Sequence, residues 1–228
     1  MRSEFLISGV AESTRIRSGQ LSGSHVVSPP LQQYFPMSHS SFARACGIDF
    51  GTSNSTVGWL RPGHPTLLSL EESRPTLPSV VFFNAEENSV SFGRAGLREY
   101  LEGYEGRLMR SLKSLLGSSL IDGRTEVQGN VVAFRDLLTQ FSATLKARAE
   151  TQGGRDFAQA VLGRPVFFVD DDPAADRLAE QTLADIARDV GFSEVSFQYE
   201  PIAAAFHYET TLAHEEVVLV ADIGGGTS

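Results

Sequence analysis

The stretch CGIDFGTSN at residues 46–54 decides the fold of this chain, together with a similar stretch, VADIGGGTS, at residues 220–228. In each, a short apolar run ends in an aspartate, a glycine follows two residues later, and a threonine comes soon after. The apolar runs predict buried strands, and the glycines predict tight turns where those strands end. One such loop alone is more often an ordinary β-turn, but two of the same design indicate a shared function.

The two loops have the chemistry of a phosphate-binding site. A glycine-rich turn lets several backbone N–H groups point toward one place, and such a nest binds phosphate oxygens. An aspartate at the end of a strand can hold a hydrated Mg²⁺ ion, and Ser and Thr hydroxyls can add contacts to phosphate. Neither loop contains the Gly-Lys-Ser/Thr of a Walker A motif or the Gly-x-Gly-x-x-Gly of a dinucleotide-binding helix.

The composition is that of an acidic globular protein. The 228 residues carry a formal net charge of −9, and 41% of them are hydrophobic, which is enough for a core. The acidic balance argues against coating nucleic acid or anionic lipid, and no apolar stretch is long enough for a membrane helix or a signal peptide. We therefore expect a soluble cytoplasmic protein without nucleic-acid or membrane partners. Cys46, the one cysteine, excludes an internal disulfide, and the Ser-rich residues 1–44 are expected to be disordered.

Hydrophobic periodicity from residue 45 onward predicts an α/β fold. A β-meander comes first, and helices then alternate with strands, which favours a mixed sheet with crossover helices. The expected strands are residues 46–50, 55–60, 66–70, 79–83, 89–92, 160–169, 195–198 and 217–222. The expected helices are residues 97–101, 107–116, 131–149, 173–190 and 201–208. In the helix at 173–190, Asp172 is the expected N-cap, Gly191 the expected stop, and Leu178, Leu183, Ile186 and Val190 the expected inward face.

Two charged residues, Lys113 and Glu200, accompany the loops. Lys113 lies in SLKSLLG and is one of only two lysines, and Glu200 precedes a proline and three alanines in YEPIAAA. Taken alone, the Lys113 segment favours an exposed helix lysine. Glu200 alone fits a helix N-terminus, where the helix dipole favours an acidic residue.

The order of these motifs resembles the N-terminal half of the ATPase domain of the seventy-kilodalton heat-shock chaperone family (DnaK-type). The resemblance covers residues 45–228, and two phrases, VLGRPVFFVD and GFSEVSFQYEPIAAAFHYE, look most similar to its YegD-type branch. The matching motifs are GIDFGTSNST, RPTLPSVVFF, SLKSLLG, VLGRPVFFVD, FQYEPIAAA and VADIGGGTS.

The resemblance implies the first lobe of an actin-like ATPase of the ribonuclease H-like fold, with ATP or ADP and Mg²⁺ as cofactors. Asp49 and Asp222 would hold Mg²⁺ through water. The residues implied in phosphate binding are Gly51, Thr52, Ser53 and Asn54 in the first loop and Gly224, Gly225, Gly226 and Thr227 in the second.

The resemblance also implies catalytic and switch residues. Lys113 would reach the γ-phosphate and stabilise the charge that develops on it, Glu200 would orient the attacking water, and Thr227 would contact the γ-phosphate. Pro165 and Arg177 match a proline switch and its arginine partner, although Asp170, Asp171 and Asp172 lengthen the stretch between them.

We expect the chain to be a truncated ATPase lobe that ends inside its second phosphate loop. On that expectation it would bind ATP weakly alone, be prone to aggregation, and hydrolyse ATP to ADP and phosphate only with a second lobe. Unfolded polypeptide or co-chaperones would be partners of the complete protein. Two alternatives stay open, a nucleotide-dependent filament protein of the actin or rod-shape type and a nucleotide-binding module without turnover.

Overall fold

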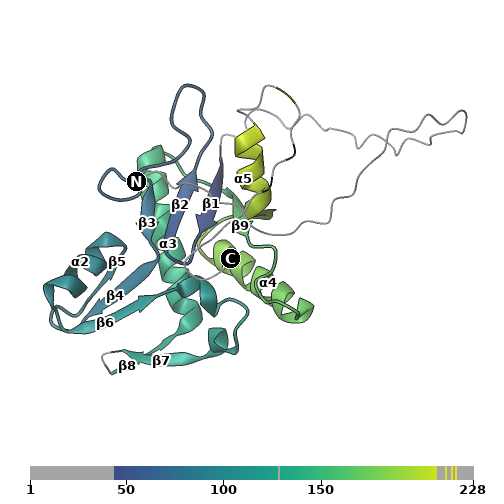
Figure 1. Ribbon diagram of the computed structural model, residues 1–228. Coiled ribbons are helices and arrows are strands. Elements are labelled where there is room, and N and C mark those ends of the chain that lie inside the picture. The colour runs from purple at the N-terminus through teal and green to yellow at the C-terminus, as the bar shows by residue number, and fades with distance from the viewer. Residues whose placement is uncertain (1–43, 128, 210–213, 215–216, 218, 220–228) are drawn as a thin grey trace, which may run out of the picture.

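The fold comes from a computed structural model that describes residues 44–127, 129–209, 214, 217 and 219. Figure 1 shows the arrangement of its elements. The strands are β1 (Ala45–Phe50), β2 (Asn54–Gly58), β3 (Thr76–Pro78), β4 (Val80–Asn84), β5 (Ser89–Phe92), β6 (Gly106–Arg110), β7 (Arg124–Val127), β8 (Asn130–Ala133), β9 (Gln159–Arg164) and β10 (Glu194–Tyr199). The helices are α2 (Arg94–Glu102), α3 (Phe134–Gly153), α4 (Pro173–Asp189) and α5 (Glu200–Glu209), with 3₁₀ helices η1 (Leu112–Leu115) and η2 (Ser119–Asp122).

The largest sheet has the strand order β10-β9-β1-β2-β3 and is mixed. β9 pairs parallel with β1 and with β10, whereas β2 is antiparallel to both β1 and β3. α4 is the crossover helix between the parallel strands β9 and β10 (Figure 1). The predicted α/β fold, a mixed sheet with crossover helices, is therefore confirmed.

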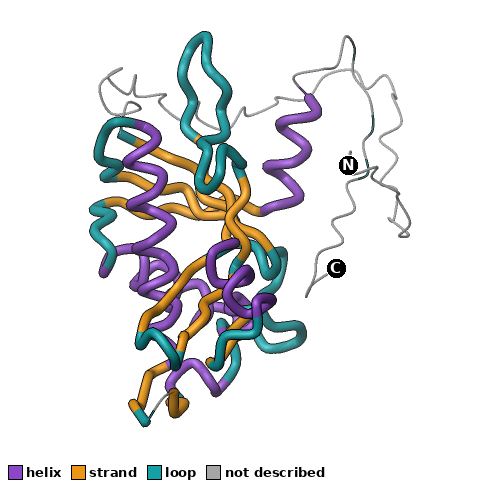
Figure 2. Tube along the Cα trace, turned by 90° about the vertical axis from the view of Figure 1, so that its left-hand side faces the viewer, coloured by secondary structure: helices purple, strands orange, loops and turns teal. Residues whose placement is uncertain are grey.

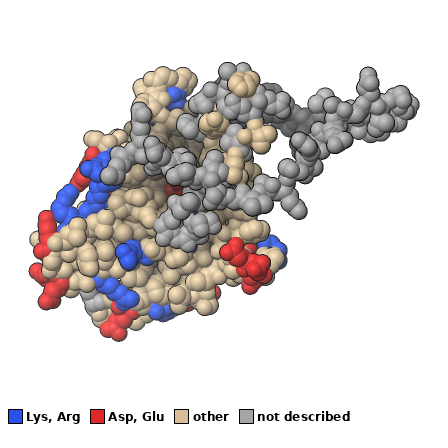
Figure 3. All heavy atoms as spheres, in the orientation of Figure 1, with Lys and Arg blue, Asp and Glu red and all other residues tan. Residues whose placement is uncertain are grey.

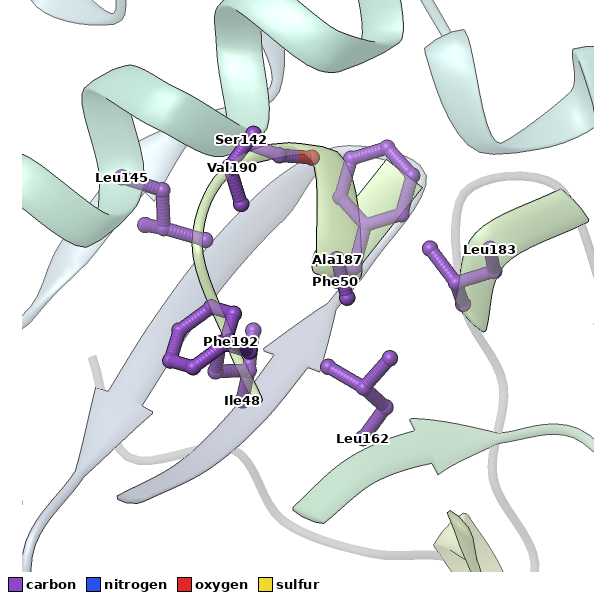
Figure 4. A pocket seen from close by; sticks show the side chains of 9 residues that line it. All are labelled: Ile48, Phe50, Ser142, Leu145, Leu162, Leu183, Ala187, Val190 and Phe192. Carbon is purple, nitrogen blue, oxygen red and sulfur yellow. The ribbon is translucent and has the colours of Figure 1, made fainter. Parts of the chain in front are cut away.

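One face of this sheet packs on α3 and α4. Alternate residues of β1 are buried, as the period of a strand requires. Ile48 from β1 and Leu162 from β9 meet Leu145 of α3 and Leu183 of α4 around a small cavity of about 20 Å³ (Figure 4). The core lies between the sheet and these two helices.

A second, antiparallel sheet with the order β5-β4-β6 lies beside the first, and α2 packs on it. Every residue of β4 is buried, because that strand is central in its sheet. β7 and β8 form a separate hairpin. α3 contacts β2 of the first sheet and β4 of the second, so one helix joins both parts of the molecule (Figures 1 and 2).

The helix predicted at residues 107–116 is wrong. Residues 106–110 form β6, which pairs with the buried β4 along its whole length. Ser111 then takes a left-handed conformation, with φ 56°, and the 3₁₀ helix η1 follows. Leu112 and Leu116 are both buried, and their helical spacing suggested an α-helix, but pairing with β4 outweighed that local preference.

The strand predicted at residues 66–70 is also wrong. Leu68 and Leu70 are buried in alternation, as expected, but only Leu67 forms an isolated bridge, to Gly58. A turn with positive φ at Glu72 and Ser73 follows, and the strand forms later, as β3.

Other boundaries also differ from the prediction. α3 begins at Phe134, because the residues before it pair as β8, and β9 ends at Arg164 instead of residue 169.

In α4, Asp172 accepts hydrogen bonds from two backbone N–H groups, which confirms the predicted N-cap. Leu178, however, is 58% exposed, and Ala179 and Thr182 are buried on the inward face with the predicted Leu183 and Ile186.

On the face drawn in Figure 3, acidic and basic side chains of the described residues lie mixed along the left, lower and right edges. Within the described ranges, no helix is both long and apolar enough to cross a bilayer.

Candidate functional site

The first glycine-rich loop is the turn between β1 and β2. An ideal Cβ at Gly51 would lie 2.2 Å from the carbonyl oxygen of Asn54, so the turn as folded has room only for glycine. Thr52 is half-buried, and Ser53 and Asn54 are exposed. The loop therefore presents backbone and hydroxyl groups to the surface at the end of β1.

Ser79, between β3 and β4, holds this loop in place. Its hydroxyl donates to the carbonyl of Gly51 at 2.6 Å and lies 3.0 Å from the hydroxyl of Ser55. Its backbone N–H donates to the carbonyl of Ser53 at 2.9 Å. Ser79 and Ser55 are fully buried, so the loop rests on a fixed polar base.

Glu200 comes to the same end of the sheet from the first turn of α5. An ideal Cβ at Gly163 of β9 would lie 3.2 Å from Cγ of Glu200 and 3.6 Å from the carbonyl oxygen of Ile48. Ile48 is buried and precedes Asp49, which is exposed, so Asp49 lies on the opposite face of the sheet from the core. The structure thus brings the carboxyl-terminal ends of β1, β9 and β10 together with the glycine-rich loop and two acidic residues.

Lys113 reaches Glu200 from η1. Its Nζ lies 2.6 Å from Oε1 of Glu200, and its side chain is only 6% exposed, compared with 18% for that of Glu200. The exposed helix lysine suggested by the segment alone is therefore excluded. Gly117, with φ 76°, fixes the end of this segment, because an ideal Cβ there would lie 2.3 Å from Cγ2 of Val169.

This arrangement fits a hydrated cation and a phosphate group. Lys113 supplies a positive charge for phosphate, the carboxylate of Asp49 is a type of oxygen ligand that Mg²⁺ prefers, and the carboxylate of Glu200 can accept a hydrogen bond from water. Within the described ranges, no group of three His, Cys, Asp or Glu residues is placed to hold a metal ion.

Each of the predicted switch residues, Pro165 and Arg177, is next in sequence to a member of a buried ion pair formed by Arg164 and Asp176. Arg177 is exposed on α4. Arg164 instead occupies the interior: its Nη2 lies 2.9 Å from Oδ2 of Asp176, and its Nη1 pairs with Glu180. Its Nε donates to the carbonyl of Pro165 at 3.1 Å, so Arg164 ties this proline to α4.

Arg164 also lies over the ring of Tyr199, 5.0 Å from its centroid, and Tyr199 directly precedes Glu200. Burial alone would lower the pKa of Arg164, but the hydrogen bonds and charges of Asp176 and Glu180 raise it above its ordinary value. Burial likewise opposes ionisation of Asp176, yet the hydrogen bonds from Arg164 and from the N–H of Phe168 hold its pKa below the ordinary value. Both groups are therefore charged at neutral pH.

Sequence reasoning missed Ser79 and Arg164. Both stand inside quoted motifs, Ser79 in RPTLPSVVFF and Arg164 in VLGRPVFFVD, but neither residue type has a distinctive spacing. Asp222 and the second loop, Gly224 to Thr227, lie outside the described residues, as does most of the strand predicted at residues 217–222.

Comparison with known families gives one match that spans this site. The sequence profile described as Hsp70 protein matches residues 45–135 and 121–228, which contain every residue predicted for the site.

Two curated relatives are chaperones by name. A chaperone protein HscA homolog of Methylobacillus flagellatus is 32% identical over 218 residues, which cover 88% of this chain and 33% of the relative. A chaperone protein HscA homolog of Vibrio parahaemolyticus is 30% identical over 220 residues, covering 88% of this chain and 34% of the relative. The chain spans about a third of the length of these relatives. Membership of a YegD-type branch stays a prediction.

Proposed function

Because this chain belongs to the Hsp70 family, we propose that it binds ATP and ADP with Mg²⁺ and, completed by a second lobe, hydrolyses ATP to ADP and phosphate. The observation that carries the proposal is the ion pair of Lys113 and Glu200. It lies at the strand ends from which the glycine-rich loop leaves, and phosphate ligands of α/β sheets bind at such ends.

The first loop would hold phosphate oxygens. The backbone N–H groups of residues 51–54 and the hydroxyls of Thr52 and Ser53 are the donors available there. Asp49 would hold Mg²⁺ through water, together with Asp222 from the second loop. The metal, when bound, neutralises charge on the phosphates. Gly224 to Thr227 would complete the phosphate contacts.

Lys113 and Glu200 would act on the transferred phosphoryl group. Lys113 would give up its contact with Glu200 and donate to a γ-phosphate oxygen, where it stabilises the charge that grows in the transition state. The freed carboxylate of Glu200 would accept a hydrogen bond from the attacking water and orient it. Thr227 would supply a further contact to the γ-phosphate.

We assign the switch to the segment around Pro165. Arg164 joins that proline to α4 and to Tyr199, the neighbour of Glu200, so a change at Glu200 has a packed route to the exposed Arg177. In the complete protein, unfolded polypeptide and co-chaperones would be the partners that respond to this change. We expect the protein to act in the cytoplasm. This part of the proposal rests on the family and on the names of its relatives.

The test measures MgATP binding by calorimetry and phosphate release with the complete gene product. Lys113→Ala is expected to slow phosphate release about a hundredfold, the usual effect of removing one donor to developing charge. Glu200→Gln is expected to lower turnover while nucleotide still binds. The matched control is Lys146→Ala, which removes the other lysine, paired with Glu150 at 2.5 Å on α3.

Equal phosphate release from Lys113→Ala and Lys146→Ala would contradict the assigned role of Lys113. Binding of MgATP without turnover in the wild-type protein would support a nucleotide-binding module. Absence of MgATP binding would overturn the proposal.

A further inference from the structure

Trp59, just after β2, is flanked by two arginines. The guanidinium carbon of Arg61 lies 4.7 Å from the centroid of the Trp59 ring, and that of Arg155 lies 5.1 Å from it. Phe157 packs edge-on against the same ring, with the centroids 5.4 Å apart. Arg155 comes from the turn after α3, so two cations from distant parts of the chain converge on one partly buried indole ring.

This cluster contains unsatisfied hydrogen-bond donors. Among the described side chains, the buried nitrogen and oxygen atoms without a partner are Nε1 of Trp59, Nε of Arg61 and Nε of Arg155. No described carboxylate forms an ion pair with either arginine. Buried donors without acceptors are rare in folded proteins, and a bound water or ion is one explanation for several of them in one place.

The cluster lies away from the proposed nucleotide site. Gly58 pairs with Gly47 near the start of β1, so Trp59 follows at that end, whereas Gly51 lies beyond the other end of the strand. Gly51 lies five positions along the chain from Cys46, which is level with Trp59, and at a rise of roughly 3.3 Å per residue this is about 16 Å. A ligand at Trp59 would therefore be distinct from one in the glycine-rich loop.

We propose that Trp59, Arg61 and Arg155 form a binding site for an oxyanion, a carboxylate or phosphate group on a small ligand. The paired N–H donors of a guanidinium group fit two oxygens of a carboxylate or of a phosphate. The indole N–H of Trp59 is a further donor in this cluster. The two arginines supply positive charge that no carboxylate of the described residues compensates by an ion pair. In a chain with a net charge of −9, a positively charged site of this kind is a local exception to the overall acidic balance.

The test uses the fluorescence of Trp59, which is the only tryptophan in the chain and so reports this site alone. The wild-type chain is titrated separately with inorganic phosphate and with succinate at constant ionic strength, because salt screens exposed charges. A saturable change of emission with either anion is expected. A response to phosphate alone, to succinate alone, or to both identifies the group that the site prefers.

Substitutions then locate the bound anion. Arg61→Gln and Arg155→Gln are each expected to weaken the apparent affinity about tenfold or more, the usual effect of losing a charged hydrogen bond. Arg155→Lys keeps the charge but loses the paired donors, so the affinity of this variant for the anion should lie between that of the wild type and that of Arg155→Gln. Arg188→Gln, which removes an exposed arginine on α4, is the matched control and should bind as the wild type does.

No saturable change with either anion would overturn the proposal, and this result needs no variant. A response that persists unchanged in Arg61→Gln and Arg155→Gln would overturn it as well, because the anion would then bind elsewhere. MgATP hydrolysis plays no part in this readout, so failure here leaves the proposed nucleotide site untouched.

Discussion

Nζ of Lys113 lies 2.6 Å from Oε1 of Glu200, across 87 residues of sequence. The pair joins η1, which follows the second sheet, to α5, which follows the last strand of the first. Because the Lys113 side chain is almost fully buried, its charge depends on Glu200 for compensation. The same contact that stabilises the fold is thus the one that the proposed reaction would have to break.

Removing either partner should destabilise the fold more than removing both. We expect Glu200→Gln and Lys113→Met each to lower the free energy of unfolding by about 1–3 kcal/mol, because the remaining group is left unpaired in the interior. The double variant should lose less than the sum of the two. Urea unfolding of the four proteins measures this coupling energy.

The control for this cycle is the exposed pair of Arg188 and Asp185, which should couple by less than about 1 kcal/mol. Additive effects of Glu200→Gln and Lys113→Met would mean that the 2.6 Å contact does not persist in solution.

The contact between Lys113 and Glu200 also shows how far the sequence could predict the site. Gly51 and Asp49 were predicted to lie at the end of a strand, because a glycine soon after an apolar run is typical of a tight turn. The environment of Lys113 could not be predicted, since it depends on β6 pairing with β4 and on the positive φ of Ser111. Long-range pairing of this kind leaves no periodic signal in the segment itself.

Arg164 illustrates a different limit of sequence reasoning. An arginine next to a proline is ordinarily an exposed loop residue, and only the fold places Asp176 and Glu180 within its reach. Helical spacing does put positions 176 and 180 on one face of α4, but nothing in the sequence identifies the cation that they face. The prediction therefore named Pro165 and Arg177 and missed the buried pair of Arg164 and Asp176, each of which immediately precedes one of them.

The ion pair of Arg164 and Asp176 predicts a pH-dependent contribution to stability. The folded-state pKa of Asp176 is below its ordinary value of 3.8, so its ionised form is favoured by folding. This stability is fully present above about pH 4 and is lost as the pH falls through the folded pKa. Asp176→Asn should therefore be less stable than the wild type at pH 7, with a difference that shrinks below about pH 4.

Urea unfolding of both proteins between pH 7 and about pH 3 checks this expectation. Asp185→Asn, on the exposed side of the same helix, serves as the control. A difference between wild type and Asp176→Asn that stays constant over the whole range would rule out the depressed pKa.

Ser79 should be needed for the shape of the glycine-rich loop. Ser79→Ala removes the hydrogen bond to the Gly51 carbonyl and leaves the buried hydroxyl of Ser55 without that partner. We expect a loss of about 1–3 kcal/mol in the free energy of unfolding and, if the proposed function holds, weaker binding of MgATP. Ser114→Ala, at an exposed hydroxyl on η1, should change stability by less than about 0.5 kcal/mol. Equal effects of the two substitutions would refute this role of Ser79.

The single thiol should report on the opening of the core. Cys46 is buried on β1, and burial raises the pKa of its thiol to about 12, from 9.0. Because iodoacetamide reacts with the thiolate, alkylation of the native chain near pH 8 should be far slower than in urea. Because the pKa is raised by folding, the thiol contributes to the free energy of unfolding below about pH 9, and this contribution is lost as the pH rises toward 12. Cys46→Ala should therefore lack that part of the alkaline decline, and native alkylation as fast as in urea would show that β1 is open to solvent.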